Sequence, residues 1–147
     1  MVLDKDFREF IALLNANDVR YLVVGGYAVG FHGYPRYTKD LDVWIEATGE
    51  NVERLTRALV EFGFGEAGLS VDDFTAEGEV VQLGFTPNRI DIVTSCEGVH
   101  FAACYAAKNE IEIDGLRIYF IDIENLIKNK ATVARPQDLA DISNLQS

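Results

Sequence analysis

The sequence feature that most constrains the fold lies between Val23 and Trp44, VVGGYAVGFHGYPRYTKDLDVW. An apolar run enters two adjacent glycines, and a second apolar run contains two aspartates one residue apart. Glycine pairs favour tight turns and let the backbone approach a ligand closely. Because side chains alternate along a strand, Asp40 and Asp42 share one face if residues 41–45 are extended. The segment therefore predicts a strand, a glycine turn, a short helix and a second strand that holds two carboxylates side by side.

Two carboxylates this close repel each other unless one is protonated, both are solvated, or a cation lies between them. Mg²⁺ suits the last case, because it prefers oxygen ligands from one or two carboxylates together with substrate phosphates. The simpler interpretation of Asp40 and Asp42 is a solvated entrance to a strand. Asp91, in the sequence RIDIV, repeats the pattern with one acid on the face opposite two isoleucines. If its strand lies beside the strand at 41–45, Asp91 completes a site of three carboxylates. Otherwise it is an aspartate at the edge of a loop or an ion-pair partner of Arg89.

Glycines and cations around the acids indicate how a phosphate chain could be held. Gly25 and Gly26 lie between an apolar strand and an expected helix, where free backbone amides can meet phosphate. The pattern lacks the Gly-Lys-Ser/Thr ending of the Walker loop and the third spaced glycine of the dinucleotide fingerprint. Arg36 and Lys39 could instead only balance the charge of Asp40 and Asp42 at the surface, and Lys130 could extend from the core to solvent. The candidates for contact with the outer phosphates are Arg36, Thr38, Lys39 and Lys130.

Hydrophobic periodicity and turn residues predict alternating helices and strands in one domain of 147 residues. We expect helices at 6–14, 27–31, 51–62, 123–131 and 136–145, and strands at 21–24, 41–45, 80–85, 89–93, 111–113 and 116–121. Asp114-Gly115 is a strong hairpin signal between the last two strands. The predicted fold class is therefore α/β (α+β), with helices flanking a mixed β-sheet.

Composition argues against several classes of protein. The chain has 24 acidic and 13 basic residues and a formal net charge of -11, which disfavours an extended surface for duplex DNA. No window is apolar enough to cross a membrane, and the N-terminus MVLDKDFREF is acidic where a signal peptide would be basic. Cys96 and Cys104 lack the spacing of a zinc site and suit reduced thiols. We therefore expect a cytoplasmic protein with no membrane partner.

The spacing of Gly25-Gly26, Asp40-Leu41-Asp42 and Asp91 resembles the signature of the nucleotidyltransferase-fold superfamily, which includes polymerase beta. The strings GGYAVGFHGYPRYTKDLDVWIE and LIKNKATVARPQDLADI further resemble small bacterial nucleotidyltransferases related to the AbiEii toxin of abortive-infection systems. This resemblance covers nearly the whole chain and implies a minimal nucleotidyltransferase fold. Gly26 departs from the pattern, because many relatives have a serine there whose hydroxyl can bind phosphate.

The resemblance implies transfer of a nucleoside monophosphate from a nucleoside triphosphate (NTP) to an RNA or protein acceptor, with release of pyrophosphate. It implies that Asp40 and Asp42 hold two Mg²⁺ ions, with Mn²⁺ as an alternative, and that Gly25 and Gly26 contact phosphate. Asp91 would bind the catalytic ion and help to activate the acceptor hydroxyl. Lys130 would fit as an added phosphate cation.

The acceptor-binding domain of larger relatives has no counterpart in the sequence, so a partner subunit would bind the acceptor or be the acceptor. One role consistent with the resemblance is the toxin of a toxin-antitoxin pair, with the antitoxin as partner. Two other functions stay open on the sequence alone. One is a nucleotide-binding sensor or antitoxin-like partner that transfers nothing, and the other is a structural domain whose acids are surface charge.

Overall fold

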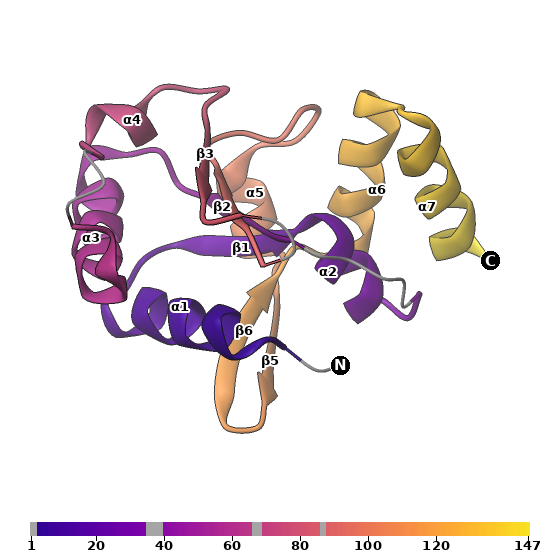
Figure 1. The fold of residues 1–147 in the computed structure, drawn as a ribbon. Coiled ribbons are helices and arrows are strands. Elements are labelled where there is room, and N and C mark those ends of the chain that lie inside the picture. Colours follow the sequence, from indigo (N-terminus) through magenta and orange to yellow (C-terminus); the bar gives the residue numbers. More distant parts are fainter. Residues whose placement is uncertain (1–2, 35–39, 66–68, 86–87) are drawn as a thin grey trace.

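The protein folds around one mixed β-sheet with helices on its faces and at one end (Figure 1). The computed structural model describes residues 3–34, 40–65, 69–85 and 88–147. In chain order the elements are α1 (Lys5–Ala16), β1 (Tyr21–Val24), α2 (Gly25–Phe31), β2 (Leu41–Ile45), α3 (Gly49–Leu59), a π-helical turn η1 (Val60–Phe64), α4 (Asp72–Thr75), β3 (Val80–Leu83), β4 (Ile90–Val93), α5 (Phe101–Ala106), β5 (Asn109–Ile113), β6 (Leu116–Phe120), α6 (Ile123–Val133) and α7 (Pro136–Gln146).

The six strands lie in the order β3-β4-β2-β1-β6-β5. β1 pairs with β2 antiparallel and with β6 parallel, and β2 pairs with β4 parallel. The two outer pairs, β3 with β4 and β5 with β6, are antiparallel. The predicted α/β (α+β) class with a mixed sheet is therefore confirmed. The parallel pairing of β2 with β4 matters most for function, because it joins the two strands that carry the predicted acids.

Side-chain alternation in β2 separates the two faces of the sheet. Leu41, Val43 and Ile45 are fully buried in the hydrophobic core. Asp42 and Trp44 point to the opposite face. There the Trp44 ring meets the Phe101 ring of α5 edge-on, with 5.2 Å between their centroids. α5 therefore packs against the face that carries Asp42, near the end of β2.

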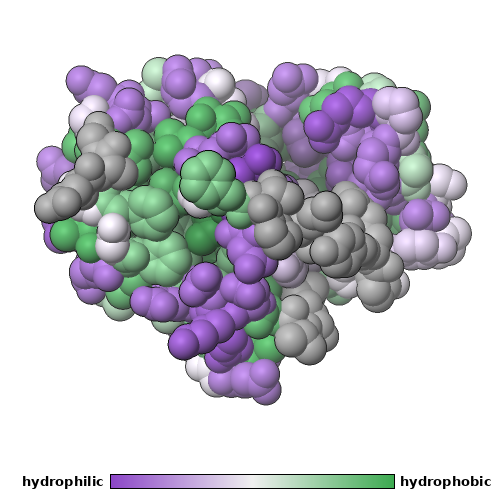
Figure 2. Space-filling view, in the orientation of Figure 1, coloured by the Kyte–Doolittle hydropathy of each residue, from purple (hydrophilic) through white to green (hydrophobic). Residues whose placement is uncertain are grey.

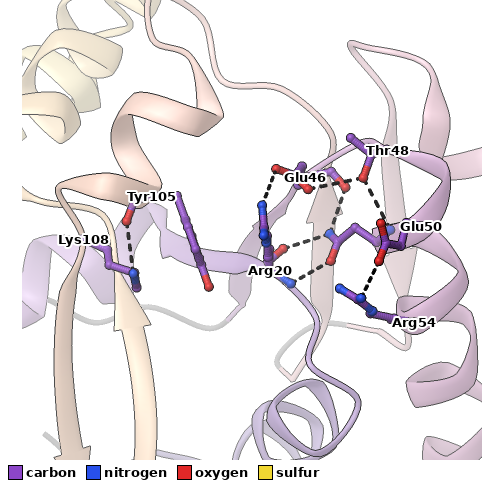
Figure 3. Close-up of polar contacts among 8 residues, drawn as sticks. Arg20, Glu46, Thr48, Glu50, Arg54, Tyr105 and Lys108 are labelled. Carbon is purple, nitrogen blue, oxygen red and sulfur yellow. Dashed lines mark hydrogen bonds and ion pairs between the residues drawn. The ribbon is translucent and has the colours of Figure 1, made fainter.

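A buried asparagine fixes the register of the central strands. Asn51, at the start of α3, is 1% exposed. Its Oδ1 accepts from the Arg20 backbone N at 2.7 Å, and its Nδ2 donates to the carbonyls of Arg20 (3.0 Å) and Glu46 (2.9 Å). Arg20 also forms an ion pair with Glu46 (Figure 3). Because the start of β1 and the end of β2 are held together here, their other ends are aligned at the glycine turn.

The structure differs from the predicted elements in several places. The helix expected at 51–62 is α3 followed by the π-helical turn η1, and the strand expected at 111–113 begins at Asn109. The helix expected from residue 27 begins at Gly25, since the first glycine itself makes the turn out of β1. The short helices α4 and α5 were not predicted, because they have four and six residues and too little hydrophobic periodicity to detect. The strand expected at 80–85 ends at Leu83. No helix in the described part of the chain is long and apolar enough to cross a membrane.

Candidate active site

Strand pairing brings the three predicted acids together. In the sheet register Asp42 lies opposite Val24 of β1 and beside Asp91 of β4. Because paired residues of parallel strands point to the same face, the Asp42 and Asp91 side chains are neighbours. Asp40 precedes β2, and its Oδ1 accepts a hydrogen bond from the Arg89 backbone N at 3.2 Å. Asp42 and Asp91 are 49 residues apart in the sequence, and their side chains thus lie together beside the glycine turn.

An arginine that the sequence analysis treated only as a neighbour of Asp91 lies between the acids. The Arg89 guanidinium donates from Nε to Asp91 Oδ1 at 2.7 Å and from Nη2 to Asp91 Oδ2 at 3.0 Å. The same Nη2 is 3.3 Å from Asp40 Oδ2. Two-point pairing of arginine with a carboxylate is among the stronger charge-assisted contacts in proteins. Arg89 therefore compensates the charge of Asp40 and Asp91 directly, whereas Asp42 feels it only at longer range.

Asp42 is the acid least able to carry a negative charge. Its pKa is raised to about 7, mainly by burial and further by the charges of Asp91 and Asp40 and a hydrogen bond with Asp91. The positive charge of Arg89 opposes the rise only in part. A carboxyl with such a pKa is partly protonated near neutral pH and gives up its proton when a cation comes close. The environment of Asp42 therefore favours a bound positive charge.

The first glycine of the pair has a steric role toward Asp42. Gly25 has a φ of +67°, in the left-handed region, and a Cβ built on it would overlap the Asp42 carboxylate. Gly26, the second residue of α2, is buried. The chain therefore turns away from β1 directly against an acid of the site, which a larger residue would displace. Contact of these two glycines with phosphate stays a prediction.

Lys130 lies in a buried ion-pair cluster between α6 and α7. The residue is 5% exposed, and its Nζ is 2.9 Å from Asp141 Oδ2 and 3.3 Å from Asp138 Oδ1. Its ammonium group does not extend to solvent, which was the alternative expected from the sequence, and the proposed phosphate contact stays a prediction. Asp138 also accepts from Arg135 Nε at 2.8 Å. The cluster thus joins the two C-terminal helices.

Arg135, at the turn between α6 and α7, is not among the residues predicted from the sequence to contact substrate. Its side chain is 72% exposed. The hydrogen bond with Asp138 is the main reason that its pKa is raised, and the charge of Asp42 contributes at longer range. Figure 2 shows a hollow between the sheet and the pair of α6 and α7, with hydrophilic residues along its rim. In the sequence, Lys128, Lys130 and Arg135 form a run without acids, which is a signal of local positive charge here.

The chemistry of the site fits a hard cation. Asp40, Asp42 and Asp91 offer only carboxylate oxygens, the ligands that Mg²⁺ prefers, and a guanidinium already stands among them as a positive charge. Within the described ranges, no three His, Cys, Asp or Glu side chains are arranged as a ready metal site. The acids are instead arranged around Arg89. The other predicted phosphate contacts, Arg36, Thr38 and Lys39, lie outside the described residues.

Residues 2–146 match a family described as nucleotidyltransferase of unknown function (DUF6036). The chain belongs to this family. The membership confirms the resemblance to nucleotidyltransferases at the level of the superfamily and confirms the prediction of an enzyme. No curated protein matches the sequence of this nucleotidyltransferase.

Solved structures share the fold of this nucleotidyltransferase at low sequence identity. A Thermotoga maritima protein designated a nucleotidyltransferase is 15% identical with a TM-score of 0.63, covering 95% of this chain and 89% of its own. The lincosamide antibiotic adenylyltransferase LnuA, solved with lincomycin, is 15% identical with a TM-score of 0.59, covering 99% and 98%. ANT(2″)-Ia in complex with adenylyl-2″-tobramycin is 15% identical with a TM-score of 0.57, covering 95% and 84%. These likenesses support the minimal nucleotidyltransferase fold.

Proposed function

We propose that this nucleotidyltransferase transfers a nucleoside monophosphate from an NTP to a hydroxyl group of an acceptor, at the site formed by Asp40, Asp42 and Asp91. The observation that carries the proposal is the pairing of β2 with β4, which brings Asp42 and Asp91 side by side from distant parts of the sequence. An acceptor oxygen would attack the α-phosphorus as the bond to the pyrophosphate oxygen breaks. The proton of the acceptor hydroxyl would pass to a carboxylate oxygen of Asp91.

The protein's own residues would contribute position and charge. Asp40, Asp42 and Asp91 would hold two Mg²⁺ ions, or Mn²⁺ in their place, and the bound metal would neutralise phosphate charge and lower the pKa of the acceptor hydroxyl. Asp42 would lose the proton that its raised pKa lets it keep in the free protein. The glycine turn, with Gly25 packed against Asp42, would hold that carboxylate beside the phosphates.

Two classes of acceptor have different support. The resemblance to AbiEii-related proteins supports an RNA or protein acceptor and the role of a toxin with an antitoxin partner. A small molecule with hydroxyl groups is the second candidate, because LnuA was solved with lincomycin and ANT(2″)-Ia with adenylyl-2″-tobramycin. The formal net charge of -11 also favours a neutral or cationic acceptor over RNA. A sensor that binds nucleotide without transferring it is the alternative to both.

Transfer of label tests the function and sorts the acceptors. The protein is incubated with Mg²⁺ and each NTP labelled at the α-phosphate, together with cell RNA, protein extract, or a set of lincosamides and aminoglycosides. We expect label on one acceptor class with the native protein and with Asp72→Ala, an exposed aspartate of α4, and none with Asp42→Ala. Nucleotide binding without transfer to any of the three classes would favour the sensor and refute the proposed transfer to these acceptors.

A further inference from the structure

We propose that Arg89 is a tethered cation that fills the metal position in the free protein, leaves it when the metal and nucleotide bind, and then pairs with phosphate. The inference rests on the proposed function, since it assumes that the acids bind a metal-nucleotide complex. It concerns a residue of the chain that lies among the acids and to which the sequence pattern assigns no role beyond pairing with Asp91. It makes Arg89 a link between metal binding and nucleotide binding.

The contacts of Arg89 are those expected of a stand-in for a metal ion. Its guanidinium reaches two of the three acids, with Nε 2.7 Å from Asp91 Oδ1 and Nη2 3.3 Å from Asp40 Oδ2. These are carboxylate oxygens that a divalent ion at this site would take as ligands. Arg89 and Asp91 point to the same face because they are two residues apart at the start of β4. The guanidinium therefore lies over the face on which the acids gather.

The backbone of Arg89 is anchored while its side chain has a route outward. The Arg89 N donates to Asp40 Oδ1 at 3.2 Å, and its carbonyl accepts from Leu41 N at 3.0 Å, so the residue is tied to the start of β2. Its side chain is 27% exposed. The guanidinium can thus turn toward solvent without any change in the pairing of β2 and β4.

Charge requires this exchange when a divalent ion binds. An arginine keeps its proton at any pH that the fold tolerates, so it cannot become neutral to make room for a second cation. A guanidinium left between Asp40 and Asp91 would occupy their oxygens and repel the ion. Once displaced, it is a planar group with five donors, anchored beside the metal-bound phosphates. Phosphate oxygens can then replace the carboxylates as its partners.

This exchange predicts that metal and nucleotide help each other to bind. Metal alone must displace Arg89 from Asp91 and Asp40 and leave it with water as its only new partner. With nucleotide present, phosphate takes up the displaced guanidinium. Since binding linkage is reciprocal, nucleotide should raise the affinity for metal by the same factor that metal raises the affinity for nucleotide.

Binding of Mn²⁺ tests the proposal without relying on catalysis. The free Mn²⁺ concentration is followed by electron paramagnetic resonance, with and without an NTP analogue whose α,β-bridging oxygen is a methylene. The variants are Arg89→Gln, Arg89→Lys and the control Arg117→Gln, an exposed arginine that pairs with Glu110 at the far edge of the sheet. In the native protein the analogue should tighten Mn²⁺ binding by at least about 5-fold, the lower end of usual coupling.

Mn²⁺ alone should bind more tightly to Arg89→Gln than to the native protein, and the analogue should increase the Mn²⁺ affinity of this variant much less. Arg89→Lys keeps the positive charge but lacks the planar guanidinium group. Mn²⁺ alone should bind it as weakly as the native protein, and the analogue should tighten Mn²⁺ binding by part of the native factor. Arg117→Gln should match the native protein. Unchanged or weaker binding of Mn²⁺ alone to Arg89→Gln, with folding verified by circular dichroism, would overturn the proposal, and so would a native protein that binds no Mn²⁺ even with the analogue present. Failure of label transfer alongside the expected exchange would refute only the proposed transfer to these acceptors.

Discussion

Replacing Gly25 by alanine should damage the fold and the site together, because the added methyl group has no room. Two separate effects act at this position. The φ of +67° lies in the left-handed region, where a residue with a Cβ loses about 1–2 kcal/mol. The Cβ would also overlap the Asp42 carboxylate and force that side chain from its rotamer, at about 0.5–1.5 kcal/mol.

Together these effects predict a loss of about 1.5–3.5 kcal/mol in the free energy of unfolding for Gly25→Ala. For a chain of this size that loss lowers the melting temperature by roughly 5–10 °C. Gly78→Ala is a matched control, because Gly78 has a φ of +80° and no atom lies within 4 Å of a Cβ there. The control should show only the backbone effect, about 1–2 kcal/mol.

Urea unfolding of four proteins separates the steric effect from the backbone effect. These are the native chain, Gly25→Ala, Asp42→Ala and the double variant. If the Asp42 carboxylate is what the methyl group meets, Gly25→Ala should destabilise the Asp42→Ala background less than the native one, by about 0.5–1.5 kcal/mol. Equal losses in both backgrounds would show that the close approach of Gly25 to Asp42 has no energetic consequence.

Two further predictions concern titration and the C-terminal helices. The pKa of Asp42 is raised to about 7 from its ordinary 3.8, so the folded protein binds more protons than the unfolded chain between these values, and stability is lost as the pH rises through that range. Asp42→Asn should therefore be more stable than the native protein at pH 8 and no more stable at pH 4 in urea unfolding; the same difference at both pH values would contradict the shifted pKa. Lys130→Met leaves Asp138 and Asp141 buried without their ammonium partner and should lower the free energy of unfolding by about 3–5 kcal/mol. Arg135→Gln, at the exposed end of the same cluster, should cost under about 1 kcal/mol, and equal losses for the two variants would contradict a buried cluster.

Much of the fold could be predicted from the sequence, because most of its strands and turns are indicated by short runs of adjacent residues. The alternation around Asp42 and the hairpin at Asp114-Gly115 each depend on a few adjacent residues, and the corresponding strands form as predicted. The gathering of Asp40 and Asp91 was stated only as a condition, since no local pattern reveals which strands pair. The glycine turn was expected to meet phosphate, and its contact with an acid of the site was not foreseen.

The ionic partners were less predictable than the strands. Lys130 does not extend to solvent, which was one of its two expected placements, because two aspartates of the next helix enclose its ammonium group. Its contact with substrate phosphate stays a prediction. Helical periodicity gives the face on which a side chain lies, but it does not say which neighbouring helix covers that face. The same limit applies to Arg89. The sequence offered Asp91 as its partner, but Asp40, which precedes β2, reaches it only in the assembled sheet.

The pairing of β2 with β4 has a consequence for the order of events during synthesis. β1 and β2 can pair as soon as both have left the ribosome, whereas β4 is synthesised only after the α3 helix and the edge strand β3. Until then Asp42 lacks its neighbour from β4. A nascent chain should thus be unable to form the proposed metal site until β4, which ends at Val93, has left the ribosome.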